Sequence, residues 1–299
     1  SIEMDIDVLD APFDETALYH SKNETKFAVR NATVEDDEQL MKISAETVPS
    51  NGITLSYERH PSYLAASHAQ YNRPDLKVVV PVDDPSIVIA MMNLGWRYCY
   101  INGQPDLMRY VADLRMNPAY RGAKVMRLLM DYVHDEIPQD TIFESVVLNA
   151  NTVAASILHH ERSGFPLPYF YDEIRTFTVS QAVKPKAFNQ YQFKTLTAES
   201  VDEANDFILK MKDHYNFLPS YDFNALVDGQ NPFWAGLNLD DFYLIYDQHN
   251  LLVGLYGLWN QKSFKQTRVI DYSRPLKLMK PFYNAYASVR GVLSLPKIQ

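Results

Sequence analysis

Glycine is scarce in this chain of 299 residues: there are ten, and no two of them are separated by a single residue. The G-x-G-x-x-G fingerprint of dinucleotide-binding folds, the G-x-S-x-G elbow and the phosphate-binding P-loop all need closely spaced glycines, so all three are excluded. A phosphate group could still bind to backbone amides at the N-terminus of a helix.

Cysteine is almost absent, and long apolar runs and a leader-like segment are missing. Cys99 is the single cysteine, so an internal disulfide is impossible and nothing requires an oxidising compartment. The longest apolar stretches, 87–96 and 251–259, are much shorter than the ~20 residues that span a bilayer. The first fifteen residues are acidic and lack the basic-then-apolar order of a signal peptide. We therefore expect a soluble, cytoplasmic protein with no membrane partner.

Positive charge is in short supply. Lys and Arg number 28 against 37 Asp and Glu, which gives a formal net charge of −9. A nucleic-acid binder held by a broad basic surface is therefore not expected. The eight histidines form no H-E-x-x-H motif, so no metal site is expected either. The 46% hydrophobic content is enough for the cores of one large or two medium domains.

The hydrophobic pattern predicts a mixed α/β (α+β) fold. An acidic arm over residues 1–25 comes first. Strands are predicted at 27–30, 76–82, 86–92, 96–101, 107–116, 142–148 and 169–179. Helices are predicted from Thr33 to near Pro49, at 61–70, after Gly122 and at 152–162, with a loop at 50–56. Asn102-Gly103 predicts a hairpin turn. These elements make one domain at 26–181.

Beyond a connector at 182–187 the pattern restarts. A shift of 164 residues pairs Thr33 with Thr197, Val78–Val80 with Phe242–Leu244, and Ala90 with Gly254. One unchanged offset across three elements indicates an internal repeat, although coincidence among common strand residues also stays open. Residue 299 corresponds to position 135, so the second unit, 188–299, would be incomplete. It is then a degenerate partial copy, or the chain stops before its natural end.

The segment 113–122 carries the most informative functional pattern. A strand ends at Pro118 and leads through Arg121 and Gly122 into an amphipathic helix. Unpaired amides and the helix dipole at such a junction make a site for a pyrophosphate group. Arg121 and Lys124 add positive charge on an otherwise acidic molecule. An ordinary strand-to-helix connection is the alternative.

Two motifs link residues 27–179 to a known family. The run L-R-M-N-P-A-Y-R-G at 114–122 matches a strand–P-x-Y-R-G–helix motif, and S-I-L-H-H-E-R-S-G-F at 156–165 matches an S-I-x-x-(Y/H)-E-(K/R)-x-G-F run. With their spacing and the strand between them, they resemble the GNAT superfamily of acyl-CoA-dependent N-acyltransferases. The resemblance implies a GNAT-like fold at 26–181, with a mainly antiparallel sheet flanked by helices, and a partial or degenerate GNAT-like domain at 188–299.

The resemblance also implies a co-substrate, acetyl-CoA or another acyl-CoA. Its pyrophosphate would bind the amides of residues 121–126, and its pantetheine arm would lie along 114–116, where two strands splay apart. A main-chain amide there would polarise the thioester carbonyl. The implied cofactor-binding residues are Leu114, Arg115, Met116, Arg121, Gly122, Ala123, Lys124, Val125, Met126 and Ser156.

Candidate catalytic groups follow from the same resemblance. His160 corresponds to the position that often donates a proton to the departing thiolate, although a helix-surface role stays open. Asp113 is the carboxylate nearest to the cofactor segment and is the candidate general base, with a sheet-edge acid as the alternative. Tyr57, Glu58 and His60 lie where the family walls its acceptor pocket. The acceptor would be a small-molecule or peptide amine.

Three departures from the family pattern leave two functions open. Lys124 and Met126 stand where small residues are usual, and Val153 replaces an asparagine. The first function is an acetyl-CoA-dependent N-acetyltransferase that transfers the acyl group directly to the amine, which the Arg121-Gly122 and His160 runs favour. The second is a non-catalytic GNAT-like CoA-ligand sensor or interaction scaffold, which Met126 and Val153 favour.

Overall fold

A computed structural model describes residues 17–50, 52–120, 123–147, 169–170, 172–174, 189–227 and 234–298. Of the predicted arm over 1–25, only residues 17–25 are described. There Tyr19 forms a β-bridge to Val29, and its hydroxyl donates to the Asp135 carboxylate at 2.7 Å. The described end of the arm therefore lies against the first strand and the helix that contains Asp135.

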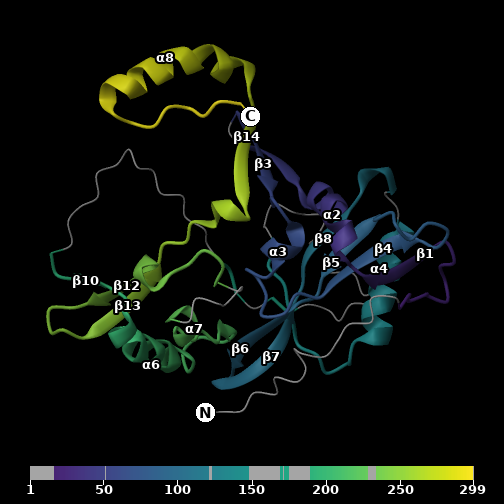
Figure 1. Cartoon of the computed structure of the whole chain (residues 1–299), viewed down its shortest axis with the longest axis horizontal. Helices are drawn as coiled ribbons and strands as arrows, with labels where there is room; N and C mark the ends of the chain where they lie inside the picture. The colour runs from purple at the N-terminus through teal and green to yellow at the C-terminus, as the bar shows by residue number, and fades with distance from the viewer. Residues whose placement is uncertain are drawn as a thin grey trace.

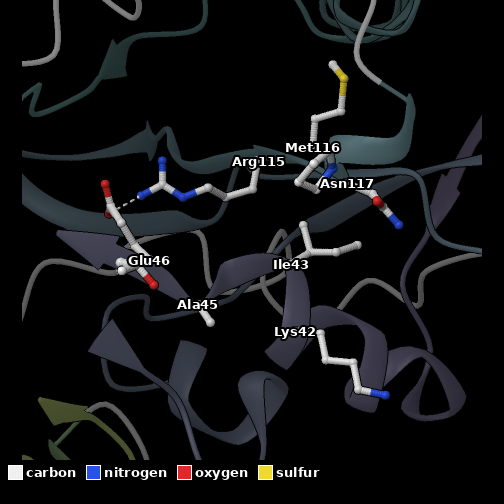
Figure 2. Close-up of a pocket in the computed structure, with 9 residues that line it drawn as sticks. Lys42, Ile43, Ala45, Glu46, Arg115, Met116 and Asn117 are labelled. Atoms are coloured by element: carbon white, nitrogen blue, oxygen red, sulfur yellow. Dashed lines mark hydrogen bonds and ion pairs between the residues drawn. The ribbon is translucent and has the colours of Figure 1, made fainter. Parts of the chain in front are cut away.

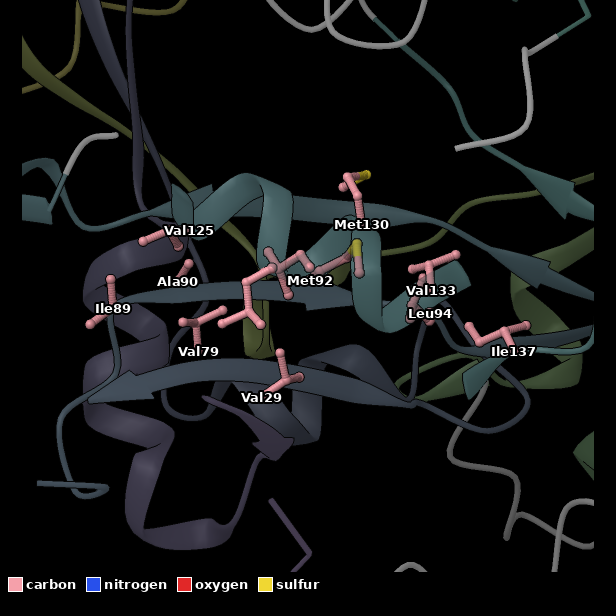
Figure 3. Close-up of a cluster of buried hydrophobic side chains, with 12 residues drawn as sticks. Val29, Val79, Ile89, Ala90, Met92, Leu94, Val125, Met130, Val133 and Ile137 are labelled. Atoms are coloured by element: carbon pink, nitrogen blue, oxygen red, sulfur yellow. The ribbon is translucent and has the colours of Figure 1, made fainter. Parts of the chain in front are cut away.

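The first sheet contains four antiparallel strands in the order β1 (Phe27–Asn31), β4 (Leu76–Pro81), β5 (Ala90–Asn93) and β8 (Ala112–Met116). Helices α2 (Asp37–Ser44) and α3 (Tyr63–Ser67) cover one face, and α4 (Ala123–Glu136) covers the other (Figure 1). Because side chains alternate along a strand, Val78 and Val80 pack toward α2 and α3, and Val79 packs under α4. Figure 3 shows the buried cluster between α4 and the sheet.

A second sheet continues from the first in the order β11 (Leu218–Pro219), β6 (Trp96–Ile101), β7 (Gln104–Tyr110) and β9 (Phe143–Glu144). The predicted hairpin at Asn102-Gly103 is confirmed, since β6 and β7 pair directly across it and both turn residues have positive φ. The predicted strand 107–116 is interrupted at Val111, where β7 ends and β8 begins. The pair β7–β9 is parallel, whereas the other pairs in this sheet are antiparallel.

A third sheet joins distant parts of the chain. Strands β2 (Glu46–Ser50) and β3 (Ile53–Glu58) form a hairpin, and β14 (Gln266–Tyr272) pairs with the outer edge of β3. The prediction of a helix to Pro49 followed by a loop at 50–56 was therefore wrong. The helix ends at Ser44, and strand pairing with β14, which is remote in sequence, outweighs the local loop signal. Helix α8 (Arg274–Arg290) follows β14.

The fourth sheet contains β10 (Gln192–Thr195), β12 (Phe242–Tyr246) and β13 (Leu252–Gly257), and α6 (Val201–Met211) packs against it. The shorter elements of the chain are η1 (Val34–Asp36), η2 (Pro118–Tyr120), η4 (Ala198–Ser200), α7 (Asn224–Val227), η6 (Leu239–Asp241) and η7 (Gln261–Ser263). No helix in the described ranges is both long enough and apolar enough to cross a membrane.

The fourth sheet and its helices repeat the element order of the first sheet and its helices. Along the chain, β10, η4, α6, β12 and β13 follow one another as β1, η1, α2, β4 and β5 do. We call the two sets the second unit and the first unit. Strands β10, β12 and β13 also pair in the same antiparallel order as β1, β4 and β5. Val29 pairs with Val79 in the first unit, and Phe193 pairs with Ile245 in the second. Ile245 therefore takes the place of Val79.

The predicted pairing of Val78–Val80 with Phe242–Leu244 was consequently wrong by two residues. The reason is that the segment before β12 is two residues longer than the corresponding segment before β4. The predicted match of Ala90 with Gly254 agrees with the strand register, because Ala90 pairs with Val79 and Gly254 pairs with Ile245. The fold class is as predicted, a mixed α+β structure with mainly antiparallel sheets flanked by helices. That residues 188–299 form a partial GNAT-like domain stays a prediction.

Candidate active site

The parallel strands β7 and β9 stop pairing after Tyr110 and Glu144, and we call this place the fork. The Arg109 amide donates to the Ile142 carbonyl at 2.9 Å, and the Val111 amide donates to the Glu144 carbonyl at 2.8 Å. The Ser145 hydroxyl then donates to the Val111 carbonyl at 2.9 Å. Beyond Val111 the chain enters β8, which pairs with β5. Within the described part of the chain, no strand pairs with the other edge of β8.

The open edge of β8 presents backbone amides. The Asn117 amide donates to the Ile89 carbonyl at 2.7 Å, so it points toward the β5 side. Because amides alternate in direction along a strand, the Met116 amide points to the open edge. The side chains of Leu114 and Met116 pack against the α4 cluster. This edge is the one along which the resemblance implies the pantetheine arm.

Helix α4 starts shortly after this edge. Lys124 is exposed in its first turn, Val125 is buried in the sheet cluster, and Met126 packs against the same cluster. The Met126 side chain is therefore packed against the sheet cluster. Four predicted site residues, Arg121, Gly122, Ser156 and His160, lie outside the described residues. Of Ala123 only the backbone, the first residue of α4, is described.

A groove of about 440 Å³ adjoins the end of β8. Its wall contains residues from the end of α2, the start of β2 and the end of β8, and Figure 2 shows them. Arg115 extends across it from β8, and its Nη2 lies 2.7 Å from the Glu46 carboxylate on β2. The Arg115 Nε is buried and has no hydrogen-bond partner in the described ranges. Arg115 therefore faces the α2–β2 side, and not the α4 side that Leu114 and Met116 face.

Asp113 occupies a bulge in β8 with a positive φ of 53°. Its carboxylate pairs with Arg59 through two contacts, Nη1–Oδ2 at 2.7 Å and Nη2–Oδ1 at 3.3 Å. The Tyr63 hydroxyl donates to the same Oδ2 at 2.7 Å. Burial, and next the charge of Asp113, raise the pKa of Tyr63 well above its usual value. Both oxygens of Asp113 are thus engaged.

The predicted acceptor residues lie together at the end of β3 and directly after it. The Glu58 carboxylate lies 3.3 Å from His60 Nε2 and 3.0 Å from Arg268 Nε. The Gln266 side chain accepts from the His60 amide at 3.0 Å and donates to the His60 carbonyl at 2.9 Å. Tyr57 is exposed on the same strand. Arg268 and Gln266 belong to β14, so the second half of the chain completes this wall.

Lys265, which directly precedes β14, also belongs to this region. Burial, and next the positive charge of Arg59, lower the pKa of the Lys265 ammonium group, while Asp113 opposes the shift. Lys265 and Arg59 were not among the predicted site residues. Lys265 lies near Arg59 because β14 pairs with β3, and no local pattern reveals that pairing.

Glu144 is a further residue that the sequence reasoning missed. It lies at the fork, opposite Tyr110 in the parallel register of β7 and β9. Burial raises the pKa of Glu144, and Arg97 only partly offsets this. Arg97 in turn covers the Tyr110 ring, with 3.5 Å from the guanidinium carbon to the ring centroid. The available signal was a single acid within an otherwise largely apolar predicted strand, 142–148.

The described residues contain no group of three or more His, Cys, Asp or Glu side chains placed to hold a metal ion. Backbone amides at the β8 edge and at the start of α4, together with Lys124, are the groups that could bind an anionic, extended cofactor. The arrangement combines an open strand edge, a helix N-terminus and a wall of charged side chains.

No protein-family model matches the sequence, and no curated protein sequence matches it significantly. Solved structures do resemble it. One is a probable N-acyltransferase from Enterococcus faecalis V583, 8% identical, with a TM-score of 0.43 over 90% of this chain and 64% of that one. Another is Saccharomyces cerevisiae N-myristoyltransferase with bound myristoyl-CoA, 11% identical, with a TM-score of 0.43 over 94% of this chain and 74% of that one.

A GCN5-related N-acetyltransferase from Kribbella flavida is 13% identical, with a TM-score of 0.40 over 91% of this chain and 61% of that one. The chain therefore spans less than two thirds of the Enterococcus and Kribbella proteins. All three structures are described as acyltransferases. All three TM-scores are below 0.5.

Proposed function

We propose that the protein transfers an acyl group from an acyl-CoA, with acetyl-CoA as the first candidate, directly to a small-molecule or peptide amine. One observation carries the proposal: β7 and β9 pair in parallel as far as Tyr110 and Glu144, and among the described residues no strand pairs with the edge of β8 that leads to α4. An extended pantetheine arm could hydrogen-bond to the Met116 amide as an added strand. The pyrophosphate would then lie at the first turn of α4, near Lys124.

The reaction needs a proton acceptor and a proton donor. The amine nitrogen attacks the thioester carbonyl carbon, the carbon–sulfur bond breaks, the amine proton goes to a base, and the thiolate takes a proton from an acid. We assign the acid role to His160 from the motif alone. Of the two carboxylates, Glu144 is the better base, because burial raises its pKa, whereas Asp113 is engaged by Arg59. Asp113 then positions Arg59 and Tyr63.

Isothermal titration with acetyl-CoA and thiol release with an amine panel test this function. We expect binding, and a loss of affinity in Lys124→Glu, because charge reversal places a carboxylate beside the pyrophosphate. Lys210→Glu is the matched control, since Lys210 is also an exposed helical lysine but lies on α6. Absence of binding at millimolar acetyl-CoA would refute the proposal.

The second candidate is a non-catalytic CoA-ligand sensor. The observation that favours it is the Arg59–Asp113 pair, which occupies the carboxylate nearest to the cofactor edge. Binding of acetyl-CoA without thiol release for any amine in the panel would favour this candidate. Thiol release that disappears in Glu144→Gln, with binding retained, would favour the enzyme.

A further inference from the structure

One face of the fourth sheet is open. Leu244 and Tyr246 point to the face that α6 covers, and both are buried. The intervening residue Ile245 and its neighbours point the other way, where Phe193 is 52% exposed and Tyr256 is also exposed. Tyr243 stacks on Tyr256 with ring centroids 5.0 Å apart. These side chains form an apolar sheet face without a covering element in the described residues.

The internal repeat indicates what kind of element fits this face. Through the strand registers, the open-face positions Phe193, Ile245, Gly254 and Tyr256 correspond to Val29, Val79, Ala90 and Met92 of the first unit. In the first unit all four are buried beneath one helix, α4 (Figure 3). A helix with an apolar side is therefore the matching cover.

Helix α8 occupies the corresponding place in the element order and has such a side. It follows β14 as α4 follows β8, and it is 17 residues long. Leu278, Phe282 and Val289 are 74%, 72% and 86% exposed, and Tyr286 is exposed as well. Spacings of four, four and three residues put these side chains on one helix face.

The chain holds its own α8 away from the open sheet face. Strand β14 pairs with β3 along Gln266–Tyr272, and the Ser273 amide donates to the Gly52 carbonyl at 2.7 Å, directly before α8 begins. Figure 1 shows α8 beyond the end of β14, apart from β10, β12 and β13. The two apolar surfaces therefore belong to one chain but do not meet within it.

We propose that α8 of one copy covers the open face of β10, β12 and β13 in a second copy, and that the exchange is reciprocal. The two parts also carry net charges of opposite sign: residues 274–298 contain five basic and no acidic residues, whereas 189–227 and 234–257 contain nine acidic and three basic residues, with Asp202, Glu203 and Asp206 on α6. A helix of 17 residues covers a strip of about 26 Å by 10 Å. Counted on both surfaces and twice per dimer, about 1,000 Å² is buried, which a specific interface requires.

Light scattering coupled to size-exclusion chromatography tests the oligomeric state of the full chain. We expect twice the 34.4 kDa of one chain. Phe282→Glu and, separately, Tyr256→Glu should each give the monomer. Both side chains are exposed in the isolated chain, so these variants should fold. Leu251→Glu is the control: Leu251 is exposed but lies before β13, outside the open face, and this variant should stay dimeric.

Cysteine cross-linking tests whether α8 of a second copy is the element that covers the open sheet face. The only native cysteine, Cys99, is buried, so introduced thiols report without interference. Chains with Val289→Cys mixed with chains with Tyr256→Cys should form a disulfide-linked heterodimer. A monomeric wild-type chain, a dimer that survives Phe282→Glu and Tyr256→Glu, or a disulfide formed within one chain that carries both cysteines would each overturn the proposal.

Discussion

Replacing Asp113 by asparagine should destabilise the protein strongly. The change keeps the size of the side chain and removes the charge that faces Arg59. The two side chains are only 11% and 17% exposed, so Arg59 would remain as a largely buried cation without its partner. Removing one member of a buried ion pair costs about 3–5 kcal/mol, and the residual exposure here favours about 3 kcal/mol. For a domain of this size the melting temperature should fall by about 6–12 °C.

Thermal unfolding followed by circular dichroism measures this shift in melting temperature. Two further variants serve as a surface control and as a test of charge compensation. Glu38→Gln breaks the Lys42–Glu38 pair, whose side chains are fully at the surface, and should leave the melting temperature unchanged. The double variant Asp113→Asn with Arg59→Met removes both charges and should recover part of the loss. The reasoning fails if Asp113→Asn melts within about 2 °C of the wild type.

The same double variant separates two roles of Asp113. If Asp113 only balances the buried charge of Arg59 and accepts no proton, acyl transfer should return in part with the stability. If Asp113 is the general base, stability should return while transfer stays absent. Thiol release measured at equal folded fraction distinguishes the two results.

Three other outcomes are expected. Burial raises the pKa of Glu144, so the folded protein binds this proton more tightly than the unfolded chain does. The free energy of unfolding should therefore fall as pH rises from the ordinary carboxyl pKa through the raised one. Urea unfolding measures this fall, and Glu144→Gln should lack it. Burial raises the pKa of Cys99 to about 12, so a thiol reagent at neutral pH should react after unfolding and not before. Gly95→Ala would place a methyl group 2.2 Å from the buried Tyr71 ring and should lower the free energy of unfolding by about 1–3 kcal/mol, measured by chemical denaturation. Gly254→Ala is the control and should lower it less, because its methyl group would lie 3.2 Å from the flexible end of Ile245.

Local patterns predicted the elements that depend on local interactions. The turn at Asn102-Gly103 and the succession of β8, Pro118 and α4 follow from turn chemistry, from the missing proline amide and from an amphipathic spacing. The repeat between β1 and β10 is visible in the sequence because both helices that follow begin at a threonine cap, Thr33 and Thr197. Each of these signals lies within about ten residues.

Interactions between distant segments were not predictable in this way. The break at Val111 depends on a bulge at Asp113 and on which partner each half of the strand finds. The sheet of β2, β3 and β14 depends on pairing across more than 200 residues, whereas its local sequence favours a loop. Helix α8 passes through Pro281, which locally disfavours a helix. The proposed acceptor wall was unpredictable for the same reason, because Gln266 and Arg268 contact His60 and Glu58 only through the pairing of β14 with β3.

The pairing of β3 with β14 also sets the order in which the site can be assembled during synthesis. Residues 53–58 emerge about 200 residues before residues 266–272, which at about 5–20 residues per second is a delay of about 10–40 seconds. During that time β3 carries an unpaired edge, which is an attachment point for other nascent strands. The hydrogen bonds between Gln266 and His60 can form only after β14 has emerged. On a nascent chain, residues 57–60 therefore lack their partners on β14 long after β8 has been synthesised.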